Sequence, residues 1–146
     1  IEGGTSVNTI ASRATALLDM RSTDIAALDK LAAQVEALVA SKAGPGLRTH
    51  IDVLGERPGG AISLDHPLVQ LAAACHIWIG IEPHYTASST DINIPLSLRI
   101  PAVCVGITQV ERAHTLEEWL SVLPISNGLA QILRFSIEAC SLLAQS

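Results

Sequence analysis

A turn-rich junction near the middle of the chain limits what the sequence can fold into. Residues 55–60 read Gly-Glu-Arg-Pro-Gly-Gly, a composition that interrupts both helices and strands. The elements before and after it are therefore expected to form separate units, residues 1–54 and residues 55–146.

The first unit predicts a β-β-α-β arrangement. Strand-like runs cover residues 6–10 and 14–20. The cluster Ser22-Thr23-Asp24 is typical of a helix N-cap, and apolar residues then recur at helical spacing until Gly44-Pro45-Gly46. Residues 47–54 alternate in polarity as a strand does. We expect an amphipathic helix on one face of an antiparallel sheet, with an open edge that favours a partner.

The second unit predicts α/β alternation with a mostly parallel sheet. Asp65-His66-Pro67 opens a helix that runs to Gly80, and a short strand is expected at 82–86. Small polar residues 87–91 lead into a helical segment at 92–98, for which Asp91 is the expected N-cap. The apolar run 101–107 is typical of a buried parallel strand, and a last helix is expected from about 126 to 143.

A single histidine lies just before another expected helix. Thr115 and Glu118 have the spacing of a capping box, which fixes a helix start. That cap would hold His114 rigidly beside a cleft. One histidine is one metal ligand, and a zinc site needs three or more, so the segment predicts part of an active site.

Composition excludes several classes of function. The formal net charge is −5, which does not favour binding to nucleic acid. The sequence also has no Lys/Arg cluster that would bind an anionic membrane surface. No apolar run approaches the roughly 20 residues that a membrane helix needs. Cys75, Cys104 and Cys140 lie far apart in apolar contexts, which predicts buried free thiols and a cytoplasmic location.

Other catalytic patterns are missing. No Gly-x-Ser-x-Gly motif supports a serine hydrolase. Four further histidines have no ligand spacing among themselves and are interpreted as surface or core residues: His50, His66, His76 and His84.

Several motifs, taken in order, resemble one family. They are Gly3–Ile10, Leu18–Ser22, Glu56–Gly59, Ser88–Asn93, Gly106 and Ala113–Thr115 with Glu118. Together they resemble the C-terminal part of the co-catalytic zinc exopeptidases, which include glutamate carboxypeptidase, tripeptide aminopeptidase, dipeptidases and amino-acid deacylases.

The resemblance implies an α/β catalytic domain that carries two zinc ions and an inserted α+β lid through which two subunits form a homodimer. Residues 1–54 would be the second half of that lid, and residues 55–146 the end of the catalytic domain. The substrate would be a small peptide or an N-acyl amino acid, whose amide bond is attacked by a metal-bound water. The family's upstream metal ligands and its general-base glutamate have no counterpart here, so the chain alone is expected to be inactive.

The resemblance also implies residue roles. His114 corresponds to the C-terminal metal-binding histidine. Asn8 and Arg57 correspond to lid residues that hold the substrate's carboxylate or carbonyl, and a guanidinium suits a carboxylate because it donates two parallel hydrogen bonds. The loop Ser88, Ser89 and Thr90 corresponds to the small-residue loop that lines the pocket. No catalytic residue is assigned.

Departures from the family pattern leave an alternative open. Gln109–Arg112 stand where the family has glycines, Ile92 where it has alanine or glycine, and Arg99 where it has glycine. Bulk and charge there would narrow the cleft or mark a chain that no longer catalyses. The alternative is a non-catalytic remnant that acts only as a folded dimerisation module. Without the family, Arg57 would be read as an ordinary solvated arginine.

Overall fold

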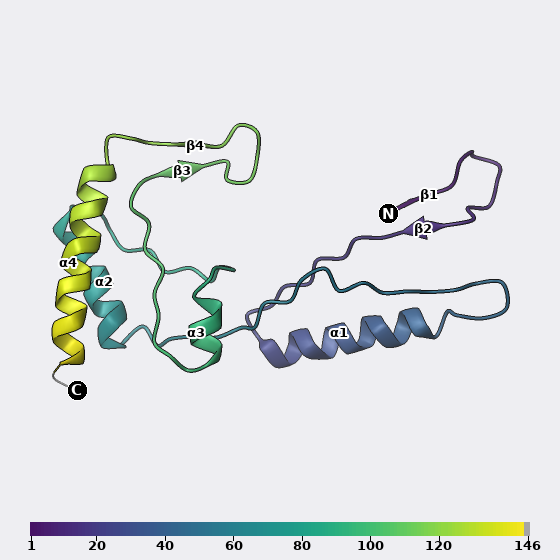
Figure 1. The fold of residues 1–146 in the computed structure, drawn as a ribbon, viewed down its shortest axis with the longest axis horizontal. Coiled ribbons are helices and arrows are strands. Elements are labelled where there is room, and N and C mark those ends of the chain that lie inside the picture. Colours follow the sequence, from purple (N-terminus) through teal and green to yellow (C-terminus); the bar gives the residue numbers. More distant parts are fainter. Residues whose placement is uncertain (145–146) are drawn as a thin grey trace. The chain divides into compact units, whose positions relative to one another are not determined.

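In the computed structural model, which describes residues 1–144, the chain divides into two compact units, Ile1–Gly55 and Glu56–Ser146. Figure 1 shows the helices and strands of each unit.

The first unit opens with a short hairpin. Strand β1 (Glu2–Gly3) pairs antiparallel with β2 (Ala14–Thr15), with Glu2 opposite Thr15 and Gly3 opposite Ala14. The strand predicted over 6–10 is not formed, because residues 4–13 form a loop, and the strand predicted over 14–20 is limited to Ala14–Thr15. In that loop the Ser6 hydroxyl donates to the Asn8 side-chain oxygen and is also hydrogen-bonded to the Thr9 hydroxyl, and local bonds of this kind compete with a strand ladder.

Helix α1 (Ile25–Ala40) confirms the helix that the periodicity predicted. Its N-cap is Asp24, whose carboxylate accepts a hydrogen bond from the Ala27 backbone N–H at 3.1 Å. This bond satisfies one of the free donors at the helix start. No residue of α1 is fully buried.

The strand expected at 47–54 is absent from the described residues. Gly44 and Leu47 form an isolated bridge across a tight turn, and Gly46 has a φ of +83° there. Beyond it, Val53 and Leu54 are mostly exposed. An alternating pattern favours a strand only where one face finds apolar neighbours and an edge finds a partner.

The second unit is centred on a helix pair. Helix α2 (Pro67–Trp78) packs against α4 (Ile125–Leu143) (Figure 1). Both helices were predicted, and Pro67 occupies the first turn of α2, where its missing N–H costs nothing. The His66 ring nitrogen Nδ1 caps α2 by accepting from the Leu68 N–H at 3.1 Å. Among the residues of this unit whose burial the structure describes, the buried ones lie on these two helices: Val69, Ala72, Cys75, Gly128 and Gln131.

Gly128 lets another segment approach α4 closely. A Cβ built on Gly128 would lie 1.9 Å from the carbonyl oxygen of Ile107. The segment that ends at Ile107 therefore passes α4 at a distance that excludes every side chain.

Helix α3 (Asn93–Ser97) is short and ends in a Schellman motif. The Arg99 N–H donates to Leu96 and the Ile100 N–H donates to Pro95, with Arg99 at a φ of +60°. Glycine usually occupies this position because an L-residue is strained in the left-handed region. Helix α2 ends in the same way, with Gly80 at a φ of +80°.

The helix expected after His114 is not formed. Residues 113–118 make turns, and strand β4 (Trp119–Leu120) pairs antiparallel with β3 (Val110–Glu111). The Thr115 hydroxyl donates to the Arg112 carbonyl instead of capping a helix. The capping-box spacing therefore closes the end of a hairpin rather than starting a helix.

The parallel sheet is not confirmed. The described residues carry two antiparallel two-stranded sheets, β1-β2 and β3-β4. The runs 82–86 and 101–107 are not strands, because no neighbouring strand supplies the hydrogen bonds that a strand requires. Mixed helices and small antiparallel sheets agree with the α+β part of the predicted class.

The cysteine prediction is correct for one residue of three. All three thiols are free, but only Cys75 is buried, whereas Cys104 and Cys140 are exposed. No helix among residues 1–144 combines the length and apolar character that crossing a membrane would take.

Candidate functional site

Arg57 contacts the loop that precedes α3. Its Nη1 donates to the Ser89 hydroxyl at 3.4 Å, and its Nη2 lies 3.9 Å from the Asp91 carboxylate. These residues are more than thirty positions apart in the chain. We name Arg57, Ser89 and Asp91 the Arg57 cluster.

Gly60 explains why Arg57 reaches this loop. A Cβ on Gly60 would lie 2.4 Å from the backbone carbon of Leu96, in α3. The junction segment thus lies directly on the backbone of α3. This contact holds Arg57, three residues earlier, beside the loop from which α3 starts.

The loop itself is fixed by a reciprocal pair of bonds. The Asn93 side chain accepts from the Thr90 N–H at 3.0 Å, and the Asn93 N–H donates to the Thr90 carbonyl at 3.1 Å. The Thr90 hydroxyl oxygen is buried and has no hydrogen-bond partner. Ser88 and Ser89 are exposed.

The prediction that Asp91 caps α3 is wrong. The N-cap is Ile92, and no side chain caps this helix. Since Asn93 already closes the loop, the Asp91 carboxylate is left fully exposed, with Arg57 as its ion-pair partner. The sequence did not predict this contact, because small polar residues such as those at 88–91 are as typical of a helix cap as of an ion pair.

The Arg57 cluster can bind an anion. The Arg57 side chain is about half exposed, at 45%, so its guanidinium can reach a ligand from solvent. A guanidinium donates from a planar fork that fits the two oxygens of a carboxylate. The Ser89 hydroxyl restricts the orientation of that fork.

His114 lies at an exposed turn of strained backbone. It has a φ of +66°, and Arg112 has a φ of +53°. Its backbone N–H donates to the Glu118 carboxylate at 2.8 Å, while Arg112 forms an ion pair with Glu117. The backbone at His114 is therefore tied to Glu118 within a turn and not within a helix cap. The left-handed residues lie in or beside Gln109–Arg112, where the family pattern has glycine.

The described residues do not fit a zinc site. Within residues 1–144, no three side chains of the His, Cys, Asp or Glu type lie close enough to hold a metal ion. His114 offers one nitrogen, and a zinc ion needs three or four protein ligands. No chemical step through zinc follows from this chain.

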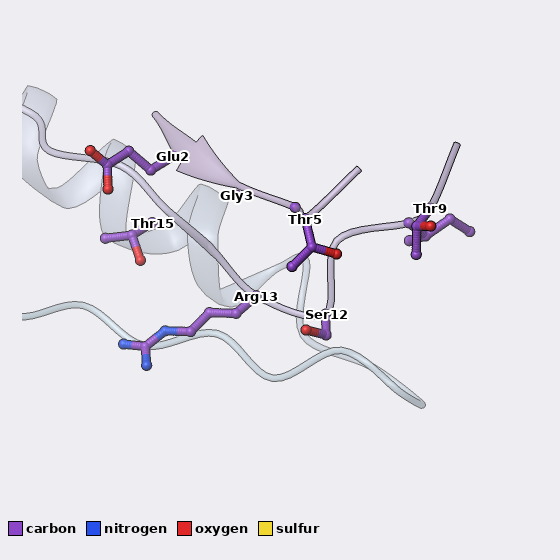
Figure 2. A pocket seen from close by; sticks show the side chains of 9 residues that line it. Glu2, Gly3, Thr5, Thr9, Ser12, Arg13 and Thr15 are labelled. Carbon is purple, nitrogen blue, oxygen red and sulfur yellow. The ribbon is translucent and has the colours of Figure 1, made fainter. Parts of the chain in front are cut away.

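Asn8 lies in the first unit, in the loop between β1 and β2. Its side-chain oxygen accepts from the Ser6 hydroxyl at 3.1 Å. The same loop encloses a pocket of about 370 Å³. Figure 2 shows that its wall carries mostly polar side chains, among them Glu2, Thr5, Thr9, Ser12, Arg13 and Thr15. Asn8 does not line this pocket.

A buried polar pair joins α2 and α4. Gln131 is 1% exposed, and its amide nitrogen lies 3.1 Å from Nδ1 of His76.

Burial raises the pKa of the neighbouring Cys75 thiol, and the Glu138 carboxylate raises it further. Arg134 of α4 stacks over the Trp78 ring at 5.0 Å. These contacts hold the helix pair together and leave His76 with a structural role, as the sequence predicted.

Comparison with known proteins identifies the first unit. Residues 1–46 match the family model of a peptidase dimerisation domain. This match confirms the resemblance drawn from the motifs. The search of curated proteins and the search of solved structures found no match.

Proposed function

Because residues 1–46 place this chain in the M20 peptidase family, we propose that it supplies a dimerisation lid and the end of the catalytic domain to a hydrolase. The reaction is cleavage of the amide bond of a small peptide or an N-acyl amino acid. Residues 1–54 form the lid part and residues 55–146 the catalytic part. A reducing, cytoplasmic setting agrees with the three free thiols.

The contact between Arg57 and Ser89 is the observation that carries the substrate assignment. A substrate of this class bears a carboxylate, and the half-exposed guanidinium of Arg57 is suited to bind it. Ser88 and Thr90 extend the same loop. Asn8, from the first unit, is assigned to the substrate's carbonyl or carboxylate.

His114 is assigned as one ligand of a zinc centre whose other ligands are not among the described residues. Zinc bound at such a centre would supply Lewis acidity and lower the pKa of a bound water. This chain's own contribution is confined to orienting the substrate through Arg57 and to holding the His114 ring at a turn.

Self-association is assigned to α1. Leu31 and Leu38 are seven residues apart on one side of the helix, and they are 43% and 58% exposed. Leu28 and Val35 lie beside them and are half-buried within their own unit. The exposed apolar flank lies beside these half-buried residues, and covering it with a second copy would remove it from water.

Sedimentation at several concentrations tests the homodimer. In the Leu31→Glu/Leu38→Glu variant, the dissociation constant of the homodimer should rise at least tenfold. The matched control is Ala33→Glu/Ala37→Glu, which adds the same charge at exposed positions on another side of α1 and should leave the dimer intact. A wild-type chain that stays monomeric at high concentration would disprove the assignment.

One observation favours a second candidate, a dimerisation module without catalysis. The described residues lack a metal-ligand cluster, and a module needs only the first unit. Measurement of N-acetylglycine binding distinguishes the hydrolase from the dimerisation module. An N-acetylglycine complex that is lost in Arg57→Gln supports the hydrolase, whereas an intact dimer without any such binding supports the module.

A further inference from the structure

Asp91 lies beside the group that is proposed to bind a ligand carboxylate. Its Oδ1 is 3.9 Å from Nη2 of Arg57, and its side chain is fully exposed. Two opposite charges at this distance attract each other, yet 3.9 Å is too long for a hydrogen bond. Asp91 therefore attracts Arg57 without using up its donors.

Asp91 has no second task that would hold it in place. It does not cap α3, because Ile92 is the N-cap and the Asn93 side chain closes the loop. The carboxylate can turn into water at the cost of a single exposed ion pair, which is weak.

A ligand carboxylate must approach the same guanidinium. The Nη1 of Arg57 already donates to Ser89, so a ligand that uses the Nη2 donors comes close to the Asp91 carboxylate. Two like charges within a few ångströms repel each other. The ligand can bind fully only when Asp91 moves away.

We propose that Asp91 is a specificity-determining residue of the Arg57 cluster, an internal carboxylate with which the ligand must compete. It lowers the affinity for every carboxylate ligand. It also disfavours ligands that carry a second negative charge, because these are repelled more strongly. The inference rests on the proposed function, in which Arg57 binds the substrate's carboxylate.

NMR titration of the 146-residue chain tests this proposal with two probes, N-acetylglycine with one negative charge and N-acetylaspartate with two. In Asp91→Asn the affinity for N-acetylglycine should rise about two- to fivefold at low ionic strength, the range of an exposed ion pair. The affinity for N-acetylaspartate should rise more. Both gains should shrink at about 0.5 M salt, where exposed charges are screened.

Two further variants make the outcome decisive. Glu82→Gln removes the same charge at an exposed position between α2 and α3 and should give a much smaller gain. Arg57→Gln should abolish binding of both probes. If Arg57→Gln abolishes binding while Asp91→Asn leaves the affinity unchanged or lowers it, the competition is refuted and the role of Arg57 stands. If Arg57→Gln binds as the wild type does, or if the wild type binds neither probe, the role of Arg57 is refuted and the competition with it.

Discussion

Replacement of Gly128 by alanine tests the packing of the second unit, because two effects change the free energy of unfolding in opposite directions. Within a helix, alanine is more favourable than glycine by about 1 kcal/mol. The new Cβ, however, would lie 1.9 Å from the Ile107 carbonyl oxygen and 2.6 Å from its carbon. Side-chain carbons do not approach other atoms within 3.0 Å, so the backbone would have to move by more than an ångström.

The size of the loss follows from what must move. Overpacking of a core costs about 1–3 kcal/mol, and here the obstacle is backbone, which cannot turn aside as a side chain can. The cost is therefore expected in the upper part of that range, about 2–3 kcal/mol. After about 1 kcal/mol of helix propensity is subtracted, we expect Gly128→Ala to lower the free energy of unfolding by about 1–2 kcal/mol. For a chain of this length that lowers the melting temperature by about 3–6 °C.

Thermal and urea unfolding followed by circular dichroism measure the change. Ser136→Ala is the matched control, because Ser136 lies on the same helix at an exposed position. This control should raise the free energy of unfolding by about 0.3 kcal/mol, because alanine has a higher helix propensity than serine. If Gly128→Ala stabilised the chain as much as the control does, the close approach of Ile107 to α4 would be refuted.

Three further predictions concern strain, titration and metal binding. Arg99→Gly should raise the free energy of unfolding by about 0.5–1 kcal/mol, because glycine adopts the left-handed conformation after α3 without strain. Gly80→Ala should lower it by about 1 kcal/mol at the equivalent position after α2. If urea unfolding showed that both variants change it in the same direction by the same amount, this reasoning would be wrong. Burial raises the pKa of Cys75 above its unfolded value, so its contribution to stability is complete below about pH 8.5 and is lost as the pH rises through the folded pKa. The stability of the wild type should therefore fall faster with alkaline pH than that of Cys75→Ala, and parallel profiles would count against burial. Zinc added to the chain in calorimetry should bind only weakly; submicromolar binding that is lost in His114→Ala would show that other ligands join this histidine.

The structure brings the side chains of Arg57 and Ser89 together. The resemblance assigned each of them to substrate binding, without predicting a contact between them. It could not place Asp91, because a small polar residue before a helix fits a cap as well as an ion pair. The N–H groups of Asn93 and Ile94, which a capping Asp91 side chain would bind, donate instead to the backbone carbonyls of Thr90 and Asp91.

The sequence by itself determined the three long helices. Their signals are local: the Asp24 cap and apolar spacing of α1, Pro67 and Gly80 at the ends of α2, and the continuous pattern of α4. The hydrogen bonds of a helix lie within the segment or at the residues that flank it, so this local sequence is enough to predict it.

Only the tertiary structure decided the strands and the turn at His114. The patterns at 47–54 and 101–107 were sound strand signals, yet a strand exists only where another segment lies alongside and shares its hydrogen bonds. The same dependence reversed the prediction after His114. There the pairing of Val110 with Leu120 drew the chain into a hairpin, although Thr115 and Glu118 had the spacing of a helix cap. A distant partner supplies the hydrogen bonds of a strand, and its position is not written in the strand's own residues.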